Sequence, residues 1–398
     1  MGKSVVVTYF DPATNGTTEI GVVVWHDLPV VRDYFARFDI PLVKASFATP
    51  GVSTIHADLR SGDIVDDYKP ASPNAALAAY AVQLAKYPFL EVGFDVPYPV
   101  PPDLLLPFGE FVEKYAIDAA MHTVFGYAQG IGDLLPIPTI YVMKLFGLDV
   151  LRNLRVGFLT TERHNNGELY EKAHLELGDD ALPSSEVVKT DRDAKGYATV
   201  FVKSPSGPKL IKASTLLVTI PPKPKNLRSL DLDSTERSLF SQFTHAGYYS
   251  ALLCKTGIPD TARIRNIGAH TAYNLPILPG VYYFAPTGIP GLHAVKYGSP
   301  VEMSDEQVKA DMIATLERLK TAGTVPSATP ERAEFVVFRS YAPFELRVPA
   351  GAIEAGFYKE LYKLQGRRRT FYTGAAFHAH DSSLLWLFTE ALLARIVA

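Results

Sequence analysis

The chain has 398 residues, of which 47% are hydrophobic and 20% charged, and a net charge of -3. Its length exceeds the size at which one hydrophobic core usually stops growing, so we expect two domains. The near-neutral charge argues against a nucleic-acid-binding protein, and the single cysteine, Cys254, excludes an intramolecular disulfide and a multi-cysteine metal site.

The first predicted elements are short strands and two helices. Runs of β-branched residues predict strands at residues 3–7 and 17–25, separated by a turn at residues 11–16. Apolar residues at helical spacing then predict helices over residues 28–38 and 71–87. This opening is typical of a mixed α/β fold.

A proline-rich segment separates this opening from a helical block. Residues 94–102 contain four prolines, which remove backbone donors and exclude a helix or central strand, so we interpret them as a crossing between domains. Helical patterns dominate residues 103–178, with interruptions at residues 126–133 and at Pro136 and Pro138. The sequence therefore predicts a helical insertion.

Short strands and isolated helices follow. Strands joined by turns predict a small antiparallel meander at residues 187–190, 197–203, 209–211 and 215–220. Further strands are predicted at residues 248–255, 281–286, 292–297, 334–341 and 370–373. Further helices are predicted at residues 234–243, 304–322, 352–364 and 382–397. This order predicts an α/β core with a second, α+β domain.

The longest basic run is Arg367, Arg368 and Arg369, just before an apolar strand. A solvated strand entry is the ordinary interpretation, and contact with a nucleotide phosphate is the alternative.

The most informative segment begins at residue 370. A strand ends at Gly374, a bend of small residues follows, and a long apolar helix begins with Asp381, Ser382 or Ser383 as its N-cap. A helix start presents unpaired backbone N–H groups and a positive dipole end, which can bind an anion or a polarised carbonyl. An ordinary capped helix has the same pattern.

This segment resembles the flavin-contacting motif of the flavin-containing amine oxidoreductases, specifically the fungal group around beta-cyclopiazonate dehydrogenase. Further similar stretches lie at residues 11–14, 30–35, 103–108, 128–133 and 216–222. The resemblance runs through nearly the whole chain. It implies an α/β fold in which a Rossmann-like FAD-binding domain is interleaved with an α+β substrate domain.

The expected FAD-binding domain comprises residues 1–60, 180–225 and 365–398, and the expected substrate domain comprises residues 61–179 and 226–364. Members of the resembled family begin with a strand, a G-x-G-x-x-G turn and a helix that binds the cofactor pyrophosphate. No G-x-G-x-x-G occurs in these 398 residues. We therefore expect a truncated FAD-binding domain or a form that binds flavin poorly.

The resemblance also implies roles for individual residues. Val187 is expected to pair its backbone with the adenine, and Gly374, Ala375, Ser382 and Ser383 are expected to line the flavin. The helix start would then stabilise the negative charge of the reduced ring. Each of these residues also has a purely structural interpretation, as a sheet residue, a turn or a cap.

Two histidines in the bend are the candidate catalytic residues. His378 or His380 could accept or supply a substrate proton. With Asp381 they could also ligate zinc, but a third outside ligand is not evident, so we predict no metal.

Aromatic residues are abundant near the predicted site. Tyr283, Phe377 and Trp386 could face a flat apolar substrate, although core packing explains them equally well.

The resemblance implies FAD-dependent dehydrogenation, with or without cyclisation, of a small apolar natural product in fungal secondary metabolism. A truncated, FAD-deficient remnant without catalytic activity and a small-molecule-binding protein are the alternatives. We expect a small-molecule substrate, no nucleic acid and no membrane span, and the oligomeric state stays open. The cytoplasm is the default location, unless a lost N-terminal segment carried a signal.

Overall fold

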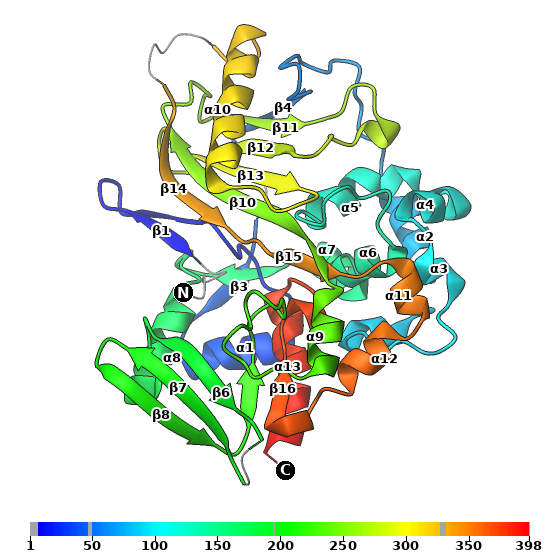
Figure 1. Ribbon diagram of the computed structural model, residues 1–398. Helices are drawn as coiled ribbons and strands as arrows, with labels where there is room; N and C mark the ends of the chain where they lie inside the picture. Colours follow the sequence, from blue (N-terminus) through cyan, green and yellow to red (C-terminus); the bar gives the residue numbers. More distant parts are fainter. Residues whose placement is uncertain (1–6, 47–49, 194–195, 327–331, 398) are drawn as a thin grey trace.

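A large mixed sheet forms the upper part of the molecule (Figure 1). The computed structural model describes residues 7–46, 50–193, 196–326 and 332–397, so the predicted strand at residues 3–7 lies outside the described residues except for Val7. In spatial order the sheet contains β14 (Glu334–Ser340), β10 (Thr244–Cys254), β13 (His293–Ser299), β12 (Gly280–Pro286), β11 (Ala262–Asn266) and β4 (Ser53–Ala57), and β15 (Phe344–Arg347) pairs with β10.

One face of this sheet is covered by α10 (Asp305–Thr321), as Figure 1 shows. Alternation along β10 sends the buried residues Tyr249, Ala251 and Leu253 into the core that this helix shares with the sheet. Ser304 and Gln307 form a capping box at the start of the helix. The alternate β10 residues, such as Tyr248, are therefore left for the opposite face.

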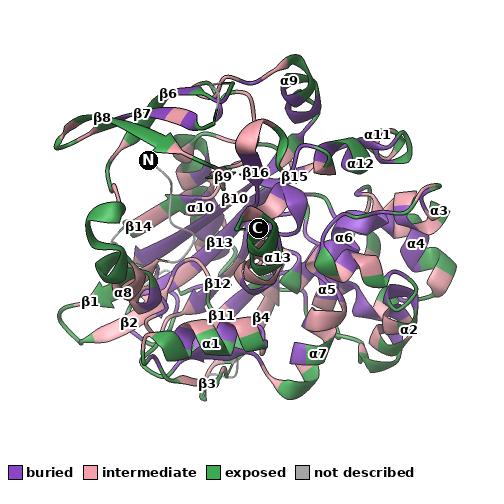
Figure 2. Cartoon of the chain, turned by 90° about the horizontal axis from the view of Figure 1, so that it is seen from below, coloured by how far each residue is buried: buried purple, intermediate pink, exposed green. Residues whose placement is uncertain are grey.

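The predicted helical insertion is present. It contains α3 (Pro102–Leu105), α4 (Phe108–Tyr115), α5 (Met121–Tyr127), α6 (Thr139–Leu145) and α7 (Leu148–Val156), and it is preceded by α2 (Asn74–Leu84), the helix predicted separately at residues 71–87. Buried residues are concentrated in this block and in the large sheet (Figure 2). Every residue of α6 from Thr139 to Lys144 is buried.

The predicted meander has three strands rather than four. β6 (Glu186–Asp191), β7 (Ala198–Ser204) and β8 (Gly207–Ala213) form an antiparallel sheet. The fourth predicted strand, β9 (Leu216–Val218), instead pairs in parallel with β16 (Thr370–Tyr372). This pairing joins segments that are far apart in the sequence.

The first described residues form a hairpin of β1 (Thr8–Asp11) and β2 (Gly16–Glu19). The strand predicted at residues 17–25 therefore ends early, and Trp25 forms only an isolated bridge with Leu159.

The predicted first helix is confirmed as α1 (Pro29–Arg37), with Leu28 at its N-cap position. This helix packs against α13 (Ser382–Ile396), the C-terminal helix. A small sheet of β3 (Leu42–Lys44) and β5 (Leu159–Thr161) and helix α8 (Glu168–Leu177) complete this region.

Two further differences from the predicted elements have local causes. The helix predicted at residues 352–364 is divided into α11 (Ala350–Glu354) and α12 (Phe357–Tyr362), because Gly356 between them adopts a φ of 97°. β4 lies within residues 1–60 but pairs with β11 in the large sheet, whereas β5 lies within residues 61–179 but pairs with β3. The predicted domain boundaries thus cross both pairings.

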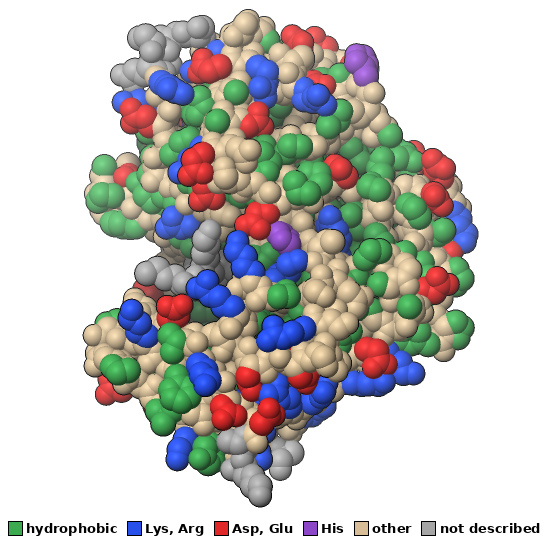
Figure 3. All heavy atoms as spheres, viewed as in Figure 1, with side chains coloured by type: hydrophobic (Ala, Val, Ile, Leu, Met, Phe, Trp, Pro, Cys, Tyr) green, Lys and Arg blue, Asp and Glu red, His purple; other side chains and the backbone are tan. Residues whose placement is uncertain are grey.

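The surface carries charges of both signs, and Lys and Arg side chains lie among Asp and Glu on the face in Figure 3. Among the described residues, no helix combines the length and apolar character needed to cross a bilayer.

Candidate functional site

The candidate site lies where β9 and β16 end side by side. In parallel α/β sheets ligands bind beyond the carboxyl ends of the strands, and Thr219 and Gly374 follow these two ends. Gly374 has a φ of 113°, and a Cβ there would lie 3.3 Å from the carbonyl oxygen of Thr219. Only glycine adopts this backbone readily, so Gly374 fixes the bend. Ala375 then begins a single 3₁₀ turn, Ala375–Phe377.

The bend leads directly into the start of α13. Asp381 is the N-cap, and its carboxylate accepts a hydrogen bond of 3.0 Å from the backbone N–H of Leu384. Among the described residues no acceptor is recorded for the backbone N–H groups of Ser382 and Ser383. This end of the 15-residue helix therefore presents donors and a positive dipole end.

His26 connects this helix start to the segment before α1. Its Nε2 lies 3.0 Å from Oδ2 of Asp381, and its backbone N–H donates to Oγ of Ser383 at 3.0 Å. Burial disfavours the protonated ring, but the charge of Asp381 and its hydrogen bond outweigh burial and raise the pKa of His26. The pKa of Asp381 is lowered, since its contacts with His26 outweigh burial. Ser383 is thus engaged through its side chain and Asp381 through an ion pair.

We expect Asp381→Asn to lower the free energy of unfolding by about 1–3 kcal/mol, because a hydrogen bond between charged groups is lost while asparagine still caps the helix. The raised pKa of His26 means that its contribution is present at low pH and disappears as pH rises through the folded-state pKa. The lowered pKa of Asp381 means that its contribution disappears as pH falls. Denaturant unfolding of both proteins should therefore show the largest difference between about pH 4 and pH 6.5. A difference independent of pH would contradict the ion pair.

The two predicted catalytic histidines lie in different surroundings. His378 is 2% exposed, and its Nε2 lies 3.0 Å from the carbonyl oxygen of Glu91 and 3.4 Å from Nζ of Lys144. Burial and the nearby charge of Lys144 lower the pKa of His378 to about 3. Burial lowers the pKa of His380 to about 3 as well. Both rings are neutral at physiological pH, so neither supplies a proton as an imidazolium.

His380 contacts an aromatic wall on the face of the large sheet opposite α10. Its ring stacks on Phe344 with 4.0 Å between the centroids, and Phe344 packs against Tyr248 at 4.9 Å. Tyr248 in turn contacts Tyr282 and donates to Gln129 Oε1 at 3.0 Å. These contacts form a continuous aromatic surface from the bend to strands β10 and β12.

The three predicted substrate residues lie in different surroundings. Tyr283 is partly exposed and follows Tyr282 on β12. Phe377 is fully buried and packs between Tyr362 and Tyr372, so it is a core residue and not a lining residue in this conformation.

Trp386 lies on α13 and is partly buried. It stacks on Trp25 with 4.7 Å between the centroids and holds α13 against the segment before α1. The indole ring of Trp386 is therefore engaged in this stacking contact.

The predicted adenine contact lies apart from the bend on the meander. Val187 is on β6, pairs with Val202 and is 38% exposed, so its side chain is accessible at the surface.

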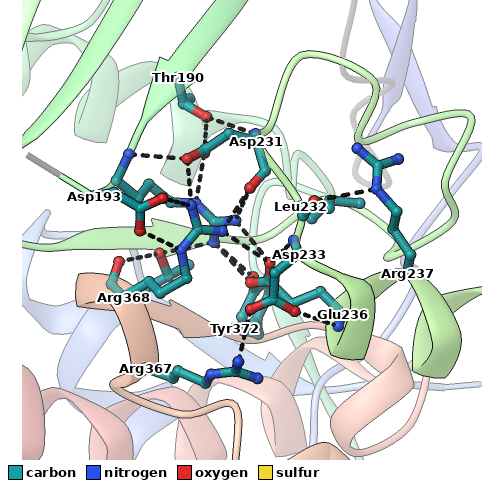
Figure 4. Close-up of polar contacts among 12 residues, drawn as sticks. Thr190, Asp193, Asp231, Leu232, Asp233, Glu236, Arg237, Arg367, Arg368 and Tyr372 are labelled. Atoms are coloured by element: carbon teal, nitrogen blue, oxygen red, sulfur yellow. Dashed lines mark hydrogen bonds and ion pairs between the residues drawn. The ribbon is translucent and has the colours of Figure 1, made fainter.

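Two arginines of the basic run, Arg367 and Arg368, pair with carboxylates, although Arg367 remains exposed. Arg368 forms ion pairs with Asp193 at 2.7 Å and Asp231 at 2.6 Å, and Arg367 pairs with Asp233 at 2.8 Å (Figure 4). Carboxylates from separate chain segments therefore neutralise Arg367 and Arg368.

These ion pairs surround a buried arginine that the sequence did not indicate. Arg192 is fully enclosed and bonds to both carboxylate oxygens of Glu236 at 2.8 Å and to Asp231 at 2.8 Å. It also donates to the hydroxyl of Tyr372 at 3.1 Å. Figure 4 shows Thr190 of β6, Glu236 of α9 (Ser234–Ser241) and Tyr372 of β16 converging on this network. The network fixes the meander to the strand that precedes the bend.

Three buried polar atoms without a hydrogen-bond partner lie in the bend or on the neighbouring strand β15. Within the described ranges, Nδ1 of His378, Nε2 of His380 and Oε1 of Glu345 are enclosed and make no hydrogen bond. The backbone N–H of His380 donates to the Glu345 carboxyl, which connects two of these residues. Because an unpaired buried polar atom costs about 1–3 kcal/mol, such a group indicates a bound ligand or water.

Three functional candidates were not predicted from the sequence. Glu345 and His26 come from elements far from the bend, and their contacts are tertiary. Lys144 could have been noticed in the sequence, because it is the one charged residue in the apolar helix Thr139–Leu145. Its ammonium donates to the carbonyl oxygen of Leu90, and burial lowers its pKa to about 7.

These residues fit the ring end of a flavin. The Gly374 bend admits close approach of a ring, the start of α13 offers backbone donors, and the unpartnered atoms of His378 and His380 offer further hydrogen-bonding positions. For a metal the fit is poor: in the described part of the chain no three His, Cys, Asp or Glu residues are grouped to hold an ion.

Comparison with known proteins gives consistent relatives. No protein-family model matches the chain. The chain is 40% identical to the FAD-dependent oxidoreductase oblC of Cochliobolus heterostrophus, covering 98% of this chain and 85% of that protein. It is 37% identical to the FAD-dependent oxidoreductase dbaF of Emericella nidulans, covering 98% and 83%. It is 32% identical to beta-cyclopiazonate dehydrogenase of Aspergillus oryzae, covering 95% and 82%.

Solved structures share the fold at low identity. A fatty acid isomerase from P. acnes that produces CLA matches with a TM-score of 0.76 and 17% identity, covering 98% of this chain and 89% of that one. Cyclohexylamine oxidase from Brevibacterium oxydans matches with a TM-score of 0.59 and 14% identity, covering 99% and 91%. The predicted α/β fold class is thereby confirmed.

Proposed function

Since this chain belongs to the fungal FAD-dependent oxidoreductases, the family of beta-cyclopiazonate dehydrogenase, and uses their cofactor FAD, we propose that it dehydrogenates a small apolar natural product of fungal secondary metabolism. The observation that supports this most strongly is the aromatic wall facing the bend. It runs from His380 through Phe344 and Tyr248 to Tyr282. An apolar surface beside a flavin half-site suits a substrate that is bound mainly by packing.

The proposed cofactor contacts follow the same geometry. Gly374 and Ala375 would lie against the flavin ring, and the backbone donors of Ser382 and Ser383 would bind its pyrimidine end. Val187 on β6 would contact the adenine. When bound, FAD accepts the hydride that leaves the substrate carbon.

The residues of the chain would bind and orient the substrate. Tyr248 and Tyr282 present ring faces, and their hydroxyls are held by Gln129 and by the backbone N–H of Gly130 at 3.1 Å. Because their hydroxyls are fixed, these two rings would hold a C–H bond of the substrate in one orientation and exclude water from it. Tyr283 would extend this surface.

We also propose a revised division of the chain. The parts expected to bind FAD remain residues 180–225 and 365–398 together with the first described elements up to β3. β4 joins the substrate half because it pairs with β11, and β5 joins the FAD half because it pairs with β3.

Anaerobic mixing of the FAD-loaded protein with a panel of apolar terpenoid and polyketide compounds tests the proposal. We expect at least one compound to bleach the visible flavin absorption, and dithionite serves as the positive control for reduction. FAD that dithionite reduces but every compound leaves oxidised would count against the proposal. Binding of a compound by FAD-free protein, with no reaction on FAD addition, would favour a small-molecule-binding protein.

A further inference from the structure

Glu345 lies between the two halves of the candidate site. It is on β15, which pairs with β10 beside the aromatic wall, and it is 6% exposed. The neighbouring Phe344 stacks on His380, and the backbone N–H of His380 donates to the Glu345 carboxyl. The carboxyl is thus held at the junction of the flavin half-site and the proposed substrate surface.

One oxygen of this carboxyl has no protein partner. Oε1 of Glu345 is enclosed and makes no hydrogen bond among the described residues. Its backbone adopts a φ of 50°, which is uncommon and unfavourable for a residue other than glycine. An unpaired buried oxygen on a strained residue is typical of a group that is held for function.

The charged and titratable neighbours of Glu345 are engaged elsewhere. Arg347 donates to the carbonyl oxygen of Ile131 at 2.5 Å and faces Asp133, and Lys144 on α6 donates to the Leu90 carbonyl oxygen. The hydroxyls of Tyr141 and Tyr358 also face it, and they bond to each other at 2.9 Å. No ion pair within 4.0 Å involves Glu345 in the described part of the chain. Burial outweighs the charges of Arg347 and Lys144 and raises the pKa of Glu345 to about 7.

The two histidines of the bend are weaker candidates for a base. The pKa of each is lowered to about 3, so a protonated ring would be unfavourable at either position. A base functions best when its pKa is near the working pH. Glu345 is the group at this junction that meets both the geometric and the chemical requirement.

We propose that Glu345 is the catalytic proton acceptor of the dehydrogenation, an inference that rests on the proposed function. The substrate carbon loses its hydrogen with the bonding electron pair, which passes to FAD as a hydride. The hydrogen on the adjacent atom leaves as a proton to Oε1 of Glu345, and its electron pair forms the new double bond. The substrate is oxidised by two electrons and FAD is reduced, and oxygen or another electron acceptor reoxidises it. The substrate class is therefore an apolar molecule with hydrogen on two adjacent atoms.

Thermal unfolding across pH tests the state of Glu345 without a substrate. The folded-state pKa is raised, so ionisation of Glu345 should cost stability between about pH 4.5 and pH 7, and the loss should persist above that range. Glu345→Gln cannot ionise, so its melting temperature should exceed that of the wild type at about pH 8 and approach it near pH 4.5. Glu334→Gln is the control, since Glu334 is an exposed carboxylate that pairs with Lys255 at 3.0 Å. A Glu345→Gln protein that melts lower at all pH values would mark a structural ion pair and overturn the inference.

Flavin reduction tests the chemical role, using a compound that bleaches FAD in the screen above. Glu345→Gln is expected to slow reduction by about 100-fold or more, while the dissociation constant of the compound changes by less than about threefold. Glu345→Asp should recover part of the rate, and the wild-type rate should rise with pH as Glu345 ionises whereas the Gln variant should not. A Gln variant that reduces FAD at the wild-type rate would overturn the inference. A screen without any bleaching compound would count against the proposed function, and the thermal comparison would then still decide between an unpaired and a structural carboxyl.

Discussion

Arg192→Met is expected to lower the free energy of unfolding by about 3–5 kcal/mol, because it leaves a buried carboxylate without its main partner. Glu236 is 2% exposed and receives two hydrogen bonds of 2.8 Å from the Arg192 guanidinium. Arg368 lies 3.4 Å from the same carboxylate and is too distant and too occupied to replace both bonds. Methionine has a volume similar to that of arginine, so the loss of stability measures the effect of the unpaired Glu236 charge rather than that of a cavity.

Two further variants isolate the cause of this loss. Arg192→Met combined with Glu236→Gln should recover part of the stability, because the second change removes the unpaired charge. Arg37→Met is the surface control, because its pairing with Glu176 is exposed on both sides and should contribute little to stability. Denaturant unfolding of these variants and the wild type gives the comparison. Equal losses for Arg192→Met and Arg37→Met would contradict a buried network.

Gly374→Ala is expected to weaken FAD binding by about tenfold or more. Alanine at a φ of 113° carries about 1–3 kcal/mol of strain, and its Cβ would press on the Thr219 carbonyl oxygen at 3.3 Å. A bend that relaxes this strain moves away from the ring position, and about 1.4 kcal/mol corresponds to a tenfold change in affinity. Titration of FAD into wild-type and variant protein, followed by flavin fluorescence, measures the difference.

The matched control for this change is Gly351→Ala. Gly351 lies in α11, and a Cβ at this position would meet no atom within 4 Å beyond its own helix and its chain neighbours. Alanine favours a helix by about 1 kcal/mol over glycine, so this variant should keep its affinity for FAD. If Gly374→Ala bound FAD as tightly as Gly351→Ala, the bend would not be the flavin contact.

Elements with a strong local signal were predictable from the sequence. Helix α1 and helix α10 follow from apolar spacing, and the three-stranded meander follows from strands separated by turn residues. β15 was missed because two of its four residues, Glu345 and Arg347, are charged, although both lie in the interior or near it. Only tertiary contacts with β10 make this segment a strand.

The candidate site was predictable only in part, because only some of its residues lie in one continuous stretch of sequence. The bend and the start of α13 are contiguous, so Gly374, Asp381 and Ser383 could be recognised from one stretch of sequence. The functions of Glu345 and His26 depend on partners in other elements, and burial sets the pKa values that decide which group acts as a base. No local sequence pattern indicates these tertiary partners or these pKa values.

The visible absorption spectrum of the purified chain after incubation with FAD and removal of free cofactor tests the central claim most directly. The geometry of the bend and the family of this chain predict a yellow protein with one flavin per chain, whose bound FAD is quenched or shifted relative to free FAD. A folded, colourless protein that takes up no FAD would contradict the account and would leave the aromatic wall as the surface of a small-molecule-binding protein.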